Sequence, residues 1–312
     1  DASVQVRRST AHALKCFTSA ADGAQYFCTD TGETVASLVD ALPDPAQDRS
    51  VNTSILEALA HVSRTRDGAS RCQRASCHLR LVELSNSAYL HKALTRVAWN
   101  LSSWPAGVRE NIGIGFVSII ARILSCAEND MELQRLAVGT LLSLSVERAG
   151  KMAVGDNEIP GVLCHLLIST CDDDVRTNVI ETIRSASELP AVRERFVREL
   201  VLHAEIVEEV FGPAAVPVIF KLLAAACEPK TGGAPDTAAT ESALRLVDRL
   251  CTASPSSNRA VFGALNSIEI LAALTECGQA PARALAATSL AALCASNGPS
   301  AARRRAAATA RP

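Results

Sequence analysis

Apolar residues recur along this chain with the spacing of one face of an α-helix, in segments that close on a glycine. Four such segments align with one another, at residues 10–23, 55–68, 94–107 and 137–150. Their final glycines recur 39 to 45 residues apart. A fifth segment, 179–192, follows 42 residues later without its glycine, and segments 243–256 and 286–299 complete seven copies. The pattern predicts seven equivalent helices in a repeating chain.

Each repeat contains further helical segments. A second apolar stretch lies between most copies, and we expect a short helix carrying a basic residue before several of the long ones. The second stretches are 34–42, 115–124, 159–167, 214–223 and 268–277, and the basic segments are 3–8, 131–136 and 173–178. A unit of about 40–47 residues with two or three helices is typical of armadillo and HEAT repeats. One helix pair cannot bury its apolar face alone, so copies stack around one continuous core.

We therefore predict an all-α fold, an armadillo/HEAT-like right-handed α-solenoid of about seven helical repeats. The predicted repeats are 1–47, 48–90, 91–130, 131–172, 173–227, 240–279 and 280–299, and an Ala/Arg-rich tail occupies 300–312. The pattern is weakest at 69–90, which lacks a clear second helix, and at 193–240. The latter region is interpreted as an insertion, with a charged amphipathic helix near 193–210 and a Gly/Pro-containing loop at 228–238.

The segments "VAWNLSS" (97–103), "GTLLSLS" (139–145) and "IPGVLCHLL" (159–167) resemble the last two helices of armadillo repeats. This resemblance runs through most of the chain. It implies a solenoid whose third helices line a groove that binds extended peptides.

Two faces of the long helices can be assigned from the alignment. Positions two before and one after Asn100 are apolar in every copy, which predicts the core face. The Asn100 position and the position four before it carry polar or small residues in every copy, which predicts an open surface. The candidate partner-binding groove consists of Glu57, His61, Arg96, Asn100, Ser143, Glu181, Ser185, Arg245 and Arg249.

The two tryptophans of the chain, Trp99 and Trp104, lie near this stripe. Trp99 is offset by about 100° from it, which favours packing on the shoulder between neighbouring repeats. Trp104 precedes Pro105 at a helix end and is expected to cover a loop. Importin-α proteins resemble this repeat but carry a Trp-x3-Asn ladder that sandwiches a cargo lysine. Here Arg96 stands four residues before Asn100, so the resemblance does not extend to a usual nuclear-import receptor.

Composition narrows the function classes. The net charge of −2 is too close to neutral for a general nucleic-acid binder, and no apolar run approaches the roughly 20 residues of a membrane span. Eleven cysteines, an odd number, favour free thiols in a reducing, intracellular compartment. Five of them sit in apolar helical stretches, namely Cys16, Cys126, Cys164, Cys251 and Cys294. Because the chain begins at Asp1 without methionine or a signal peptide, we expect it to be the ordered part of a longer protein.

Motifs for chemistry are weak. Cys72, Cys77 and His78 have donor atoms for zinc, but no second Cys/His pair follows at ligand spacing. Cys164 and His165 suggest a nucleophile and a base, yet adjacent helical residues point about 100° apart. The three aspartates at 172–174 are typical of a helix start. We expect no enzyme activity, no cofactor and no metal.

A finer resemblance concerns the armadillo-repeat family of the ciliary radial spoke, radial spoke head protein fourteen. It rests on residues 1–27, on 38–68 with Asp44-Pro45, Arg49 and Asn52, and on 133–183. The resemblance implies a structural component of the axoneme of cilia and flagella, in the cytoplasm and cytoskeleton. Partners would be other radial-spoke or axonemal subunits and tubulin, which the arginine tail could contact, with no nucleic acid and no membrane.

Two other functions stay open. An armadillo adaptor for cytoskeletal, vesicle or adhesion partners is one, and a regulatory subunit of an enzyme complex is the other. Fold alone does not choose among them.

Overall fold

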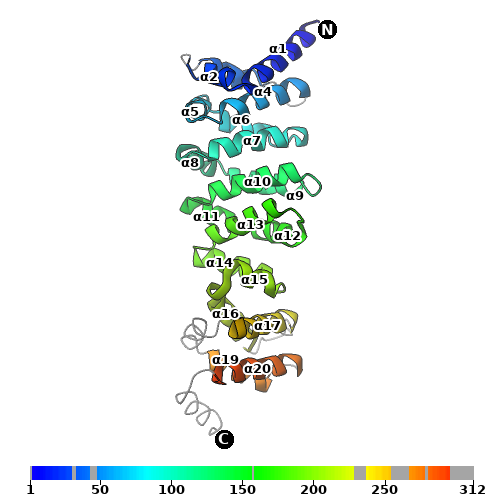
Figure 1. Ribbon diagram of the computed structural model, residues 1–312, viewed down its shortest axis with the longest axis vertical. Helices are drawn as coiled ribbons and strands as arrows, with labels where there is room; N and C mark the ends of the chain where they lie inside the picture. Colours follow the sequence, from blue (N-terminus) through cyan, green and yellow to red (C-terminus); the bar gives the residue numbers. More distant parts are fainter. Residues whose placement is uncertain are drawn as a thin grey trace. The chain divides into compact units, whose positions relative to one another are not determined.

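A computed structural model of the chain describes residues 2–29, 33–42, 48–156, 158–227, 237–253, 267–277 and 280–295 (Figure 1). Every regular element in these ranges is a helix. The chain divides into two compact units, unit 1 (residues 1–192) and unit 2 (residues 193–312). No helix among the described residues is both long enough and apolar enough to span a membrane.

Unit 1 is built around five long helices, separated in sequence by pairs of shorter α-helices, and a 3-10 helix, η1 (Ala88–Leu90), also precedes α7. The long helices are α1 (Ala2–Ser19), α4 (Arg49–Val62), α7 (His91–Ser102), α10 (Met131–Leu144) and α13 (Asp173–Ala186). The first short helix of each pair is α2 (Ala21–Thr29), α5 (Arg66–Arg74), α8 (Pro105–Gly113) or α11 (Arg148–Val154). The second is α3 (Glu33–Asp40), α6 (Cys77–Leu84), α9 (Phe116–Ser125) or α12 (Ile159–Ser169). Each long helix packs against the next, and Figure 1 shows them side by side in chain order.

Two local expectations were wrong. The basic segments 3–8, 131–136 and 173–178 form no separate helices, because they are the first turns of α1, α10 and α13. The short helix instead comes after each long one. The weak region 69–90 does contain a second helix, α6, which contributes the buried residues Cys77, Leu81 and Leu84.

The recurring glycine has a steric cause in this arrangement. Gly68, Gly107 and Gly150 lie inside the short helices, not at the ends of the long ones. A Cβ on Gly107 would lie 2.1 Å from the carbonyl oxygen of Leu101, in the last turn of α7. The corresponding distances are 2.0 Å for Gly68 and 1.9 Å for Gly150. Because no side chain tolerates such a contact, glycine permits the sharp turn from each long helix into the short helix that follows.

The predicted core face is buried in the middle of unit 1. Leu59, Ala98, Leu141 and Ile183 are each 0% exposed, and Leu101 and Leu144 lie beside them in the core. The first copy differs, because Phe17 is 50% exposed and packs edge-on against Tyr26 instead of a further long helix. The helical spacing of apolar residues therefore identified the core face in the second to fifth copies.

Unit 2 contains α15 (Ala204–Phe211), η2 (Gly212–Ala215), α16 (Val216–Cys227), α17 (Thr237–Ala253), α19 (Ser267–Cys277) and α20 (Ala280–Ala295). Helix α14 (Pro190–Leu200) carries the boundary between the units. The single helix expected near 193–210 is two helices, α14 and α15, interrupted at 201–203. Most of the predicted loop 228–238 and the whole tail 300–312 lie outside the described residues.

Candidate partner-binding surface

The candidate groove residues of unit 1 lie on four consecutive long helices. Glu57 and His61 come from α4, Arg96 and Asn100 from α7, Ser143 from α10, and Glu181 and Ser185 from α13. Glu181 is exposed, and the other six are half-buried. We call this set, together with Trp99, the long-helix surface. Whether a partner occupies it stays a prediction.

Neighbouring repeats are connected by three residues at the Asn100 position, namely His61, Asn100 and Ser185. The Asn100 Nδ2 donates to the Ala60 carbonyl oxygen at 2.7 Å and to the Ser63 Oγ at 3.2 Å. The Ser185 hydroxyl donates to the Ser145 carbonyl oxygen at 2.8 Å, and the His61 Nδ1 lies 3.3 Å from the Thr18 hydroxyl.

Each of these contacts reaches the C-terminal end of the preceding long helix. Asn100 and Ser185 bond there to carbonyl groups, which lack intrahelical partners at a helix end. The amide nitrogen of Asn100, which the sequence placed in a groove for a partner, is therefore engaged within the chain.

Ion pairs join the opposite ends of the same helices. Asp48, Asp130 and Asp172 are the N-cap residues of α4, α10 and α13, and each accepts a backbone N–H three residues on. A basic residue of the preceding long helix pairs with each, in Arg8–Asp48 at 3.0 Å, Lys92–Asp130 at 3.1 Å and Arg135–Asp172 at 2.5 Å.

Hydrogen bonds from Arg135 and from the Val175 N–H lower the pKa of Asp172 below its ordinary 3.8. Desolvation acts to raise the pKa values of Asp48 and Asp130, but hydrogen bonds from the backbone and from Arg8 or Lys92 outweigh it, so both are lowered as well. The sequence predicted helix starts at such aspartates but not their pairing across repeats, which depends on which helices become neighbours.

Charged groups of the surface are partly paired among themselves. Arg96 forms an ion pair with Glu132, Lys15 with Glu57 at 2.5 Å, and Glu181 with Arg184 at 2.9 Å. Burial lowers the pKa of His61, and the charges of Arg64, Arg96 and Lys15 lower it further against an opposing effect of Glu57. The imidazole therefore lies in a locally positive environment. Lys15 and Arg64 were absent from the predicted set because they lie beside the aligned positions.

Trp99 packs against the next repeat, as its position on the shoulder predicts. A Cβ on Gly139 of α10 would lie 3.1 Å from the indole Cε2 and 3.3 Å from Cζ2. Gly139 thus allows the indole to lie against the helix backbone, while 39% of the Trp99 side chain stays exposed. Trp104 is half-buried at the N-cap of α8, in the turn between α7 and α8.

The remaining two candidates, Arg245 and Arg249, lie on α17 of unit 2 and are exposed. The Arg249 guanidinium pairs with Glu205 at 2.9 Å and Glu208 at 3.1 Å, both from α15. Arg245 pairs within its own helix, with Glu241 at 3.7 Å. Their place in a common groove with the unit 1 residues stays a prediction.

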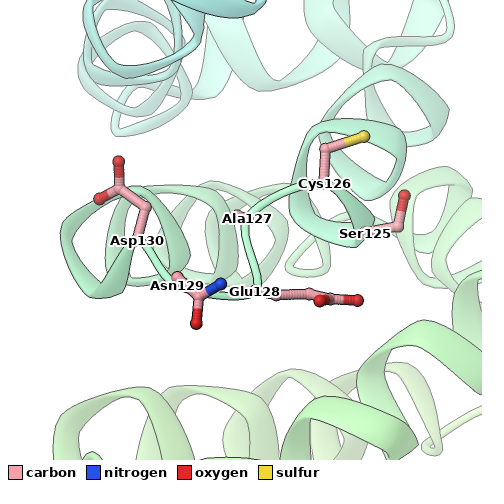
Figure 2. Close-up of a pocket in the computed structure, with 6 residues that line it drawn as sticks. All are labelled: Ser125, Cys126, Ala127, Glu128, Asn129 and Asp130. Atoms are coloured by element: carbon pink, nitrogen blue, oxygen red, sulfur yellow. The ribbon is translucent and has the colours of Figure 1, made fainter.

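A shallow hollow of about 430 Å³ lies on the loop between α9 and α10, lined by residues 125–130 (Figure 2). Its polar groups largely serve the fold, because Asp130 caps α10 and Gln134 donates to the Ala127 and Glu128 carbonyl oxygens. Figure 2 shows that its side chains point in different directions instead of converging on one point. The hollow therefore offers no small-molecule site of the usual kind, in which a few polar groups converge.

The cysteine and histidine motifs form no arrangement for chemistry. Cys72 and Cys77 are fully buried, and a hydrogen bond with Cys77, together with burial, raises the pKa of the Cys72 thiol, which disfavours the thiolate. In the described ranges, no three His, Cys, Asp or Glu side chains are grouped to hold a metal ion. Cys164 is buried while His165 is exposed, so the two lie on different faces of α12. Cys16 and Cys126, expected in apolar surroundings, are exposed. The side chains of Cys251 and Cys294 lie outside the described residues.

Comparison with known proteins identifies the fold but no family. No protein-family model matches the sequence, and none of the curated proteins compared with it matches either. An engineered protein solved by a structural genomics consortium superimposes with a TM-score of 0.55 at 19% identity, over 97% of this chain and 78% of its own.

A structure from work on the phosphorylation switch that controls the interaction between cadherin and beta-catenin also gives a TM-score of 0.55. It has 16% identity and covers 99% of this chain and 54% of its own, so this chain spans about half of that protein's length. A designed armadillo repeat protein in complex with the peptide (KR)4 gives 0.48 at 12% identity, over 85% of this chain and all of its own. The repeated helices of the chain, together with the two structures that superimpose with a TM-score of 0.55, show an all-α, armadillo-like solenoid fold.

Proposed function

We propose that this chain is a non-catalytic scaffold that binds an extended segment of a partner protein across α4, α7, α10 and α13. One observation carries this proposal. Equivalent positions of four consecutive long helices carry polar side chains that are half-buried or exposed, and the exposed indole of Trp99 lies beside them. Solenoids use such extended surfaces, and not enclosed pockets, to hold partners. The fold shared with the beta-catenin structure supports the same reading, because that protein interacts with cadherin.

Amide hydrogen exchange of the full chain, measured with and without a partner protein that co-purifies with it, tests the proposal. We expect partner binding to slow exchange of the amides of α7 and α10, and to leave α5, α8 and α11 nearly unchanged. These short helices belong to the same repeats and serve as the internal control. Protection confined to the short helices would refute binding at the long-helix surface.

We further propose that the scaffold is an axonemal component of cilia and flagella, within the radial spoke. This proposal rests on the sequence resemblance of residues 1–27, 38–68 and 133–183 to that family. The partners would be other spoke subunits and tubulin. Adaptors for cytoskeletal, vesicle or adhesion partners and regulatory subunits of enzymes are the competing assignments.

Sedimentation of axonemes from ciliated cells separates these assignments. We expect the tagged chain to pellet with axonemes and to be released by high salt more readily after removal of residues 300–312, since four arginines would be lost. A chain that stays in the supernatant, or that is produced in cells without cilia, would refute the axonemal assignment and leave the scaffold proposal intact.

A further inference from the structure

The groups of the long-helix surface that stay available to a partner are fewer than its sequence suggests. The Asn100 amide nitrogen and the Ser185 hydroxyl donate to the preceding long helices, and Arg96 is paired with Glu132. The Ser143 hydroxyl donates to the Gly139 carbonyl oxygen of its own helix. What remains is an apolar area beside Trp99 and a basic area around Arg64.

The apolar area lies between α7 and α10. Gly139, on which the Trp99 indole packs, is followed along the same face of α10 by Leu142 and then by Val146, just beyond the helix end. Leu142 is half-buried, whereas Val146 is 70% exposed. We call Trp99, Leu142 and Val146 the apolar patch. A large indole supported by a rigid helix backbone is the kind of residue on which binding energy concentrates.

The basic area lies at the C-terminal end of α4, the long helix that precedes α7 and packs against it. Arg64 follows the end of α4, is exposed, and forms no ion pair within the described parts of the chain. Arg64, Arg96 and Lys15 all act on His61 as positive charges, and only Glu57 opposes them. Since Lys15 is paired with Glu57 and Arg96 with Glu132, Arg64 supplies the unbalanced positive charge.

This inference rests on the proposed function. We propose that the long-helix surface selects a segment that carries a carboxylate beside Arg64 and a large apolar side chain on the apolar patch. Packed helix axes lie about 8–10 Å apart, and an extended chain advances about 3.3 Å per residue. A segment crossing from α4 to α7 therefore covers one interhelical spacing in about three residues. The acidic and apolar residues of the partner segment are about three positions apart.

Charge complementarity excludes the opposite partner. A basic segment at this place would meet the unbalanced guanidinium of Arg64, and mismatched charges at an interface are penalised. The apolar patch adds specificity that charge alone would not give, because an acidic segment without an apolar residue leaves the indole exposed to water.

A peptide array tests the proposal with the full chain. The probes are twelve-residue Gly/Ser peptides that carry two aspartates and one phenylalanine at systematically varied separations. A matched set carries lysines in place of the aspartates. We expect the acidic set to bind at least tenfold more tightly, best at a separation of about three, and to weaken as salt is raised. Tighter binding of the lysine set, no dependence on separation, or no binding of either set would overturn the proposal.

Two pairs of variants assign the binding to the two areas. Arg64→Glu is expected to weaken the acidic peptides about tenfold, while Arg74→Glu, at an exposed position of the short helix α5, leaves them unchanged. Trp99→Ala is expected to remove the advantage of phenylalanine-containing peptides over peptides without it. Met152→Ala, which truncates a 58% exposed side chain on α11, should not. Equal effects within either pair would overturn the assignment.

The same assay separates this inference from the proposed function. If peptides of another composition bind and Trp99→Ala abolishes their binding, the selectivity inference fails and the scaffold function stands. If peptides bind and no variant of the long helices affects them, both fail.

Discussion

Replacing Gly107 by alanine tests the cause of the recurring glycine, and Gly113 provides a control within the same helix. A Cβ at position 107 would lie 2.1 Å from the Leu101 carbonyl oxygen, 2.8 Å from the Leu101 carbonyl carbon and 3.1 Å from the Gln73 Nε2. At position 113 a Cβ would meet nothing within 4 Å. Both glycines belong to α8, and neither has a positive φ.

The magnitude follows from this geometry. The contact with Leu101 involves backbone, so neither atom can swing aside, and the start of α8 must move by roughly 1 Å away from α7. Overpacking of this kind costs about 1–3 kcal/mol and sometimes more. Gly107→Ala should therefore reduce the free energy of unfolding by about 3 kcal/mol. Gly113→Ala should raise it by about 0.5–1 kcal/mol, because alanine loses less backbone entropy in a helix.

Urea denaturation followed by far-ultraviolet circular dichroism measures the difference. We expect the midpoint of Gly107→Ala to fall and that of Gly113→Ala to rise slightly, with unchanged slopes. Equal midpoints for the two variants would refute the steric explanation. The glycine would then reflect only the turn preference that its position suggests in the sequence.

Three further predictions concern the core, the repeat contacts and acid stability. Leu141→Ala should lower the free energy of unfolding by about 2–5 kcal/mol, because Leu141 is 0% exposed, whereas Ser143→Ala should leave it nearly unchanged. Similar shifts of the melting temperature in the two variants would mean that the helix faces are wrongly assigned. Asn100→Ala should cost about 1–2 kcal/mol in urea denaturation, since two hydrogen bonds to α4 and its C-cap are lost, and an unchanged midpoint would contradict those bonds. The N-cap aspartates have folded pKa values below the ordinary 3.8, so their contribution is present above that pH and is lost as pH falls through the lower folded values. Denaturation midpoints should thus drop as the pH falls below the ordinary aspartate pKa of 3.8, and Asp172→Asn should reduce that drop. An equal drop in the variant would refute a role for Asp172.

The repeat and the core face were both predictable from the order of residues alone. Helical periodicity is a local property, and seven copies in a common phase revealed it even at low aromatic content. For the same reason Leu59, Ala98, Leu141 and Ile183 could be placed in the core before any contact was known. The position of Trp99 on the shoulder also followed from helix geometry alone, and its contact with Gly139 agrees with it.

The contacts of the polar residues, in contrast, depend on how the helices pack against one another. Asn100 and Ser185 were assigned to a partner surface because they lie opposite the core. The same two side chains, however, also reach carbonyl groups at the end of the adjacent helix. Which of the two occurs depends on the distance between neighbouring repeats, and no local pattern encodes that distance. The pairing of Arg135 with Asp172 likewise joins residues 37 positions apart that meet only when α10 packs on α13. The glycine was visible in the sequence as a repeat marker, yet its cause, a backbone oxygen about 2 Å from where a Cβ would lie, exists only in the packed turn.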